Sequence, residues 1–136
     1  FLPAWHWSQR GLLDRNKSLW GSWLLEFPDL TIYFAGDTAY ANHFRIIGQT
    51  FPIDYAILPI APCKPRKWLD ATHMDAHQAL LAFFELQAKH FIPAHWGTYA
   101  FGAEAAYEPV MILMEAWDSC YRRLPAQKIH LLSRPT

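Results

Sequence analysis

Short apolar runs alternate with segments of helical periodicity along this chain, and this alternation predicts an α/β fold. The pattern predicts strands at 1–7, 20–27, 30–35, 54–60, 89–94 and 128–132, and helices at 41–49, at 75–88 and from Glu108 onward. The run at 54–60 is apolar throughout, as in a strand buried on both faces. Residues 61–72 combine prolines with charges and are interpreted as a loop. Since no repeat or linker divides the chain, residues 1–136 are expected to form a single domain portion.

Three apolar runs end on side chains that can bind a metal, namely His6, Asp37 and His95. Functional side chains collect where strands end and loops begin, so we expect these three to converge. Imidazole nitrogen and carboxylate oxygen are common zinc ligands, and a carboxylate can bridge two metals. Each residue alone also has a structural interpretation: Asp37 as a helix cap, and His6 as a histidine packed between tryptophans.

A second group of metal-competent residues lies at His73, Asp75 and His77, at two-residue intervals. On a strand they would share one face and form an independent metal site. The segment, however, lies where a loop passes into a helix, and Asp75 has the character of an N-cap. We therefore expect His73 to contact substrate or stabilise its charge, and His77 to lie on the helix surface.

The amino-acid composition limits the classes of partner and the cellular location that we expect. Hydrophobic residues make up 52% of the chain and seven tryptophans are present, as in a folded protein. Twelve basic residues balance twelve acidic ones, so nucleic acid is not an expected partner. Cys63 and Cys120 are interpreted as ordinary thiols, which suits a cytoplasmic location, although Lys64 and Lys67 could lower the pKa of Cys63. No apolar run reaches the roughly 18 residues that span a bilayer, which leaves peripheral membrane attachment open.

Several longer motifs resemble one family, the metallo-β-lactamase superfamily, and within it the branch that hydrolyses N-acylphosphatidylethanolamine by phospholipase D chemistry. The resemblance is carried by Pro3–Ser8, Leu12–Trp23, Phe34–Tyr40, Leu58–Ile60, His73–Asp75 and His95–Thr98. The block from Asp14 to Trp23 is more specific than the ligand positions themselves.

This resemblance implies an αββα sandwich with a two-zinc site. His6 would then ligate one zinc and His95 the other, while Asp37 would bridge both and His73 would lie near the substrate phosphate. The implied reaction is zinc-dependent hydrolysis of the phosphodiester in N-acylphosphatidylethanolamine-like phospholipids, with Asp37 and His73 as catalytic residues.

The chain departs from the family in one respect: it lacks the H-x-H-x-D-H motif that supplies the remaining ligands. It is therefore expected to be the C-terminal half of the sandwich, which binds zinc weakly and is inactive without the N-terminal half. Its exposed sheet face would favour homo-oligomers. Two alternatives stay open, a metal-dependent lactonase or other hydrolase of the superfamily, and a non-catalytic association domain. The aromatic and apolar residues Phe1, Leu2, Trp5, Trp7 and Trp20 are expected in the core, or else along a lipid-binding groove.

Overall fold

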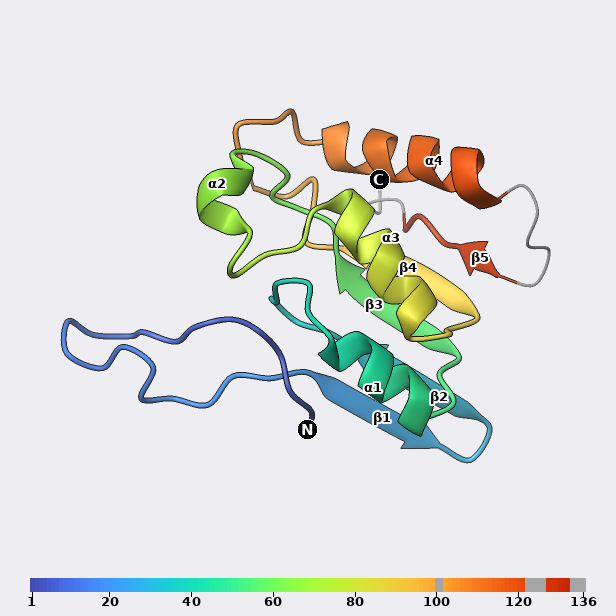
Figure 1. Cartoon of the computed structure of the whole chain (residues 1–136), viewed down its shortest axis with the longest axis horizontal. Coiled ribbons are helices and arrows are strands. Elements are labelled where there is room, and N and C mark those ends of the chain that lie inside the picture. Colours follow the sequence, from blue (N-terminus) through green and yellow to red (C-terminus); the bar gives the residue numbers. More distant parts are fainter. Residues whose placement is uncertain (100–101, 122–126, 133–136) are drawn as a thin grey trace.

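A five-stranded sheet organises the computed structural model, which describes residues 1–99, 102–121 and 127–132 (Figure 1). Its strands are β1 (Trp23–Phe27), β2 (Leu30–Phe34), β3 (Tyr55–Pro59), β4 (His90–Ala94) and β5 (Lys128–Ile129), in that spatial order. β1 and β2 form an antiparallel hairpin, and the other neighbours are parallel. The carboxyl ends of β2, β3 and β4 therefore meet at one edge of the sheet.

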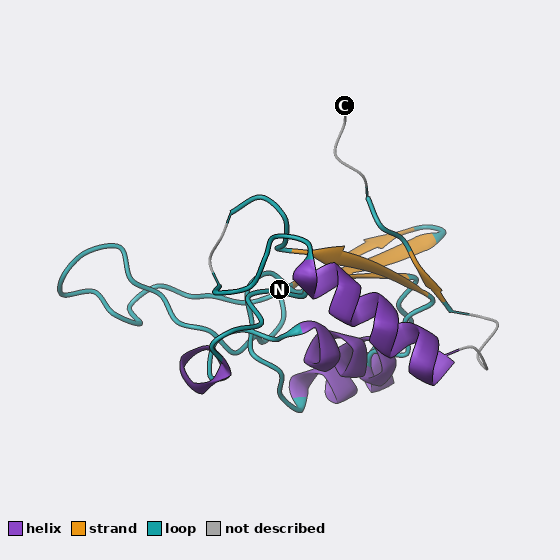
Figure 2. Ribbon diagram, turned by 90° about the horizontal axis from the view of Figure 1, so that it is seen from above, coloured by secondary structure: helices purple, strands orange, loops and turns teal. Residues whose placement is uncertain are grey.

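The helices cover one face of this sheet and leave the other open (Figure 2). They are α1 (His43–Thr50), α2 (Arg66–Leu69), α3 (Ala76–Glu85) and α4 (Glu108–Tyr121). Large buried side chains from both layers meet between them, including Phe44 of α1, Phe83 of α3 and Phe91 of β4. This layered arrangement confirms the predicted α/β class. None of the described helices has the length and apolar character needed to cross a membrane.

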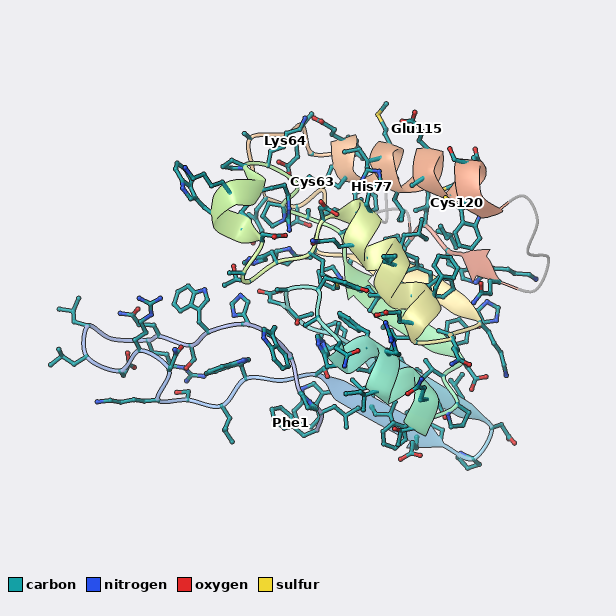
Figure 3. The ribbon with its side chains drawn as sticks, in the orientation of Figure 1. Phe1, Cys63, Lys64, His77, Glu115 and Cys120 are labelled. Carbon is teal, nitrogen blue, oxygen red and sulfur yellow. The ribbon has the colours of Figure 1, made fainter. Side chains whose placement is uncertain are left out.

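The start of α3 follows the predicted capping pattern. The side chain of Asp75 accepts a hydrogen bond from the backbone N–H of Gln78 at 2.8 Å, and the Gln78 side chain accepts one from the Asp75 N–H at 3.3 Å. This reciprocal capping box satisfies two N–H groups that a helix start leaves unpaired. His77 lies exposed on the helix surface, as predicted (Figure 3).

Three element predictions were wrong, each for a local reason. No strand covers 1–7: Leu2 alone pairs with Ser22, because Pro3 has no N–H and the Trp5 N–H donates to the Thr38 hydroxyl instead. The expected loop 61–72 contains α2, which an ion pair between Arg66 and Asp70 stabilises. The helix predicted at 75–88 ends at Glu85, since Gln87 adopts a left-handed φ of 54°.

Three of the residues expected in the core lie outside it, which corrects part of a further expectation, whereas Leu2 packs against the core and Trp20 is half-buried. Phe1, Trp5 and Trp7 are exposed, and the segment pairs only at Leu2, with Ser22 just before the edge strand β1. Cys63 is buried, and burial raises the pKa of its thiol, so Lys64 does not activate it. Cys63 and Cys120 are both free thiols, as predicted.

His43 is a buried, neutral histidine that makes stability depend on pH. Its side chain at the start of α1 is 4% exposed, neither ring nitrogen has a hydrogen-bond partner in the described residues, and burial lowers its pKa to about 4. In the unfolded chain the imidazole of His43 is protonated below about pH 6.5. Between that pH and pH 4, the unfolded chain therefore binds a proton at His43 that the native state does not bind. Stability is therefore full above that pH and falls as pH drops toward 4, by roughly 3 kcal/mol.

We expect His43→Leu to move the acid-unfolding midpoint to lower pH, because the substitution removes this protonation. The exposed His77→Gln serves as the matched control and should leave the midpoint in place. Circular dichroism along a pH titration measures both. An acid midpoint of His43→Leu identical to that of the unsubstituted chain would contradict this assignment.

Candidate metal centre

Two of the predicted ligands follow β2 and β4, the strands on either side of β3, at the same edge of the sheet. Asp37 comes shortly after β2, and Gly36, with a left-handed φ of 63°, turns the chain just before it. His95 follows β4 directly and itself adopts a left-handed φ of 61°. A non-glycine residue costs on the order of 1–3 kcal/mol in this region, and such strain is concentrated at functional sites. Both turns bring side chains across the strand ends.

His6 reaches the same edge without belonging to a strand. The backbone N–H of Trp5 donates to the Thr38 hydroxyl at 2.8 Å, and the Ala39 N–H donates to the Trp5 carbonyl at 2.7 Å. Thr38 is fully buried, so this anchor is fixed. Thr38, which follows Asp37, thus fixes the position of Trp5, which precedes His6. The two candidate ligands are therefore held close together.

The side chains form a compact cluster. One ligand atom from each of His6, Asp37 and His73 lies within 4.8 Å of the others. His95 adjoins this group, with its Nε2 3.4 Å from Oδ1 of Asp37. The His73 ring centroid lies 5.1 Å from that of His6 and 5.7 Å from that of His95. A cavity of about 230 Å³ opens beside Asp37, His73 and His95, with Pro62 and Leu69 completing its lining.

Hydrogen bonds to backbone carbonyls fix the tautomers of two imidazoles. Nδ1 of His6 donates to the Trp7 carbonyl at 2.8 Å, and Nδ1 of His95 donates to the Ala61 carbonyl at 2.8 Å. A carbonyl can only accept, and a neutral imidazole has a single N–H. Nε2 of each ring therefore carries a lone pair, as required of a metal ligand oriented by its surroundings.

A test of fit comes from the Nε2 atom of His6. It is buried and has no hydrogen-bond partner among the described residues. A buried polar atom without a partner is costly, and a divalent cation would satisfy this lone pair. Two or three imidazoles with one carboxylate match the donor types of zinc sites. The residues present therefore fit a divalent metal.

The environment of His73 favours a neutral ring. Burial lowers its pKa, the nearby imidazoles of His6 and His95 lower it as well, and the Asp37 carboxylate acts in the opposite direction. Nδ1 lies 3.0 Å from the Thr72 hydroxyl, which itself lies 3.4 Å from the Leu69 carbonyl. When that hydroxyl donates to the carbonyl, it accepts from Nδ1–H and leaves the lone pair on Nε2.

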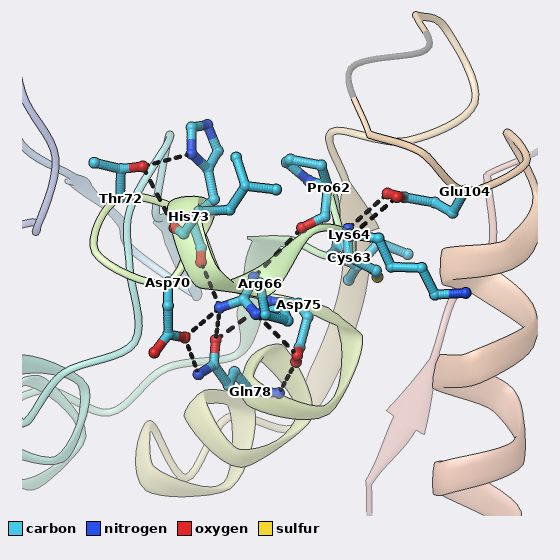
Figure 4. Close-up of polar contacts among 12 residues, drawn as sticks. Pro62, Cys63, Lys64, Arg66, Asp70, Thr72, His73, Asp75, Gln78 and Glu104 are labelled. Atoms are coloured by element: carbon cyan, nitrogen blue, oxygen red, sulfur yellow. Dashed lines mark hydrogen bonds and ion pairs between the residues drawn. The ribbon is translucent and has the colours of Figure 1, made fainter.

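Arg66, which sequence reasoning missed, holds the segment that carries His73 (Figure 4). Its Nη2 donates to the His73 carbonyl at 3.0 Å and to Oε1 of Gln78 at 2.8 Å, and its Nε lies 3.4 Å from Asp75. Arg66 also pairs with Asp70. The i,i+4 spacing of Arg66 and Asp70 was a signal that could have revealed this short helix.

The alternative site at His73, Asp75 and His77 is not assembled. Asp75 uses its carboxylate on the cap of α3 and on Arg66, and His77 is exposed. Among the described residues, the only group of three with ligand atoms in mutual reach is His6, Asp37 and His73.

Comparison with known proteins places this geometry in a family. The family model of the beta-lactamase superfamily domain matches residues 1–96, a region that contains all four clustered residues. The chain belongs to the metallo-β-lactamase superfamily. It is 36% identical over 121 residues to N-acyl-phosphatidylethanolamine-hydrolyzing phospholipase D 1 of Caenorhabditis elegans, covering 87% of this chain and 34% of that relative. It is 39% identical over 97 residues to the outer membrane protein RomA of Klebsiella pneumoniae, covering 71% of each.

Solved structures of the superfamily share this fold. Igni18, a metallo hydrolase from Ignicoccus hospitalis, superposes with a TM-score of 0.67 at 22% identity, covering 98% of this chain and 48% of that structure. The chain thus spans about half of that structure and about a third of the nematode relative. The arrangement of sheet and helices is that of the metallo-β-lactamase fold, as the motifs predicted.

Proposed function

We propose that this chain is the C-terminal half of a zinc-dependent phosphodiesterase of phospholipase D type, acting on N-acylphosphatidylethanolamine-like lipids. The observation that carries the proposal is the buried, unpartnered Nε2 of His6 beside Asp37 and His73. The phosphodiester substrate is supported by the relative whose printed name gives that activity.

His6, Asp37, His73 and His95 would have different roles in metal binding and in substrate binding. His6 and His95 would each hold one metal, and Asp37, close to both, would supply the carboxylate that the two metals share. A bound divalent metal supplies Lewis-acid polarisation and a reactive water at neutral pH. Asp37 would contribute the negative charge that holds the ions, and its carboxylate is partly open to the cavity.

His73 is suited to the substrate side of the reaction. Its neutral ring borders the cavity beside Asp37. The oxygen of a water adds to phosphorus, the bond from phosphorus to the N-acylethanolamine oxygen breaks, and that oxygen takes up the proton that the water loses. When the Thr72 hydroxyl donates to Nδ1 instead, the neutral ring carries its proton on Nε2, and that N–H would donate to a phosphate oxygen and hold the phosphodiester in the cavity.

The open sheet face supports the proposal that another half of the sandwich completes the site. Trp23, Leu25 and Phe27 of β1 and Phe34 of β2 are exposed on it. Apolar side chains gathered on one face indicate a surface that another layer covers. The upstream segment with the H-x-H-x-D-H motif would bring both that layer and the missing ligands.

The test compares the chain alone with the chain co-expressed with a superfamily half that carries the H-x-H-x-D-H motif. We expect the pair, and not the single chain, to hold two zinc ions by mass spectrometry and to release phosphatidic acid from N-acylphosphatidylethanolamine. A pair that holds zinc but hydrolyses a lactone and no phosphodiester would assign the lactonase alternative. Metal-free dimers of the chain, unaffected by the other half, would assign the association domain.

A further inference from the structure

The loop of residues 61–64, between β3 and α2, lies beside the candidate metal centre and contacts one of its histidines. The Ala61 carbonyl accepts a hydrogen bond from Nδ1 of His95 at 2.8 Å. The next residue, Pro62, lines the cavity that Asp37 and His95 border. Residues 61–64 belong to neither a helix nor a strand, so the direction of the Ala61 carbonyl depends on other contacts that hold this loop.

One side chain, Glu104, holds the 61–64 loop by its backbone (Figure 4). Oε1 of Glu104 accepts a hydrogen bond from the Cys63 N–H at 2.6 Å, and Oε2 accepts one from the Lys64 N–H at 3.0 Å. Successive N–H groups that point at one place form a site for an anion, and a carboxylate satisfies both of them. Since Cys63 is buried, an unpaired N–H at this residue would be costly.

The residues next to Glu104 are arranged to admit its carboxylate. A Cβ on Gly102 would lie 2.1 Å from Oε2 of Glu104 and 2.4 Å from its Cδ, so only glycine leaves this space open. The Ala103 N–H also donates to the Lys64 carbonyl at 3.2 Å. Residues 102–104 therefore hold the loop through a side chain and through the main chain.

We propose that Glu104 is a positioning residue for the candidate metal centre, acting on His95 through the 61–64 loop. By holding the loop, Glu104 keeps the Ala61 carbonyl directed at Nδ1 of His95. That carbonyl keeps the imidazole proton on Nδ1, so that the Nε2 lone pair stays available to a metal. When the carboxylate is removed, the loop can move, and the proton can pass to Nε2 and be donated to Oδ1 of Asp37, 3.4 Å away. A protonated Nε2 cannot bind a metal.

Nitrogen NMR of the imidazoles in the metal-free chain tests the first part of this inference. The spectra are recorded at about pH 8.5, where histidine is ordinarily neutral, and His95→Gln identifies the signals of this ring. We expect the unsubstituted chain to carry the His95 proton on Nδ1. In Glu104→Ala the ratio of Nδ1–H to Nε2–H should fall about fivefold or more, the effect of losing one oriented hydrogen bond.

Zinc affinity tests the second part, in the pair formed with the half that carries the H-x-H-x-D-H motif. Glu104→Ala should lower the affinity by about 10–100-fold, as expected when a group that orients a metal ligand is removed. Gly102→Ala should lower it as well, because the added Cβ displaces the carboxylate while its charge is kept. Glu115→Ala is the matched control, since Glu115 is exposed on α4, and it should change neither the tautomer nor the affinity (Figure 3).

Thermal unfolding shows that each variant is folded, and Gly102→Ala should unfold as the unsubstituted chain does, because the Glu104 side chain can rotate away. An unchanged His95 tautomer in Glu104→Ala would overturn the proposal. An affinity loss in Glu104→Ala that Gly102→Ala does not share would overturn it too, since the charge alone would then explain the loss. The inference rests on the metal centre of the proposed function. A pair that binds no zinc would count against that function, and the tautomer ratio would still decide the role of Glu104.

Discussion

Replacing Asp37 by alanine is expected to lower the zinc affinity of the assembled pair by more than about 100-fold and to abolish measurable hydrolysis. Even the groups that merely orient a metal ligand change affinity by about 10–100-fold, and Asp37 is placed to be a ligand itself. It is also the carboxylate in the group with His6 and His73, and it lies 3.4 Å from Nε2 of His95. Its loss would leave neutral imidazoles alone to hold divalent charge.

A competition titration against a zinc-binding dye measures this affinity, and Asp37→Asn separates charge from shape. Asparagine keeps the size and one oxygen, so zinc should bind more weakly than in the unsubstituted pair but more tightly than with alanine. Asp29→Ala is the control, because Asp29 is exposed in the turn between β1 and β2. Unchanged zinc affinity for Asp37→Ala would remove this residue from the metal centre.

The strand ends were the part of this site that sequence could predict. Asp37 and His95 each follow an apolar run that predicts a strand. Because parallel strands bring their carboxyl ends to one edge of a sheet, the sequence alone predicts that these two residues lie at the same edge. His6 was predicted to be close for the wrong reason. Its position depends on the Trp5 N–H meeting the Thr38 hydroxyl, a contact between residues 33 positions apart that no local pattern encodes.

The supporting residues were beyond sequence reasoning for a related cause. Arg66 contacts the carbonyl of His73 and the side chains of Asp75 and Gln78, all brought together by the tertiary fold. Every residue has a backbone carbonyl, so residue type does not indicate which carbonyl accepts a hydrogen bond. The contact of His95 with the Ala61 carbonyl therefore could not be predicted from the sequence. Periodicity predicts which face a residue occupies, and contacts between loops must be read from the folded chain.

Gly48→Ala is expected to destabilise the fold by about 3 kcal/mol or more, against the usual sign of this substitution. In an exposed helix, alanine in place of glycine stabilises by about 1 kcal/mol. Here a Cβ on Gly48 would lie 2.2 Å from the Glu85 carbonyl oxygen and 2.6 Å from the Cα of Leu86. Both are backbone atoms at the end of α3, so neither can rotate away, and α1 would have to move off the core where Phe44 and Ile47 are buried.

Urea unfolding of the chain measures this change, and Gly11→Ala is its control. A Cβ on Gly11 would lie 3.7 Å from the nearest Asp14 oxygen, an ordinary contact, so its unfolding midpoint should stay in place. Because α1 follows Asp37 and its anchor Thr38, displacement of this helix should also weaken zinc binding in the assembled pair. A stable Gly48→Ala variant with an unchanged midpoint would show that α1 does not pack against the end of α3 as closely as these distances require.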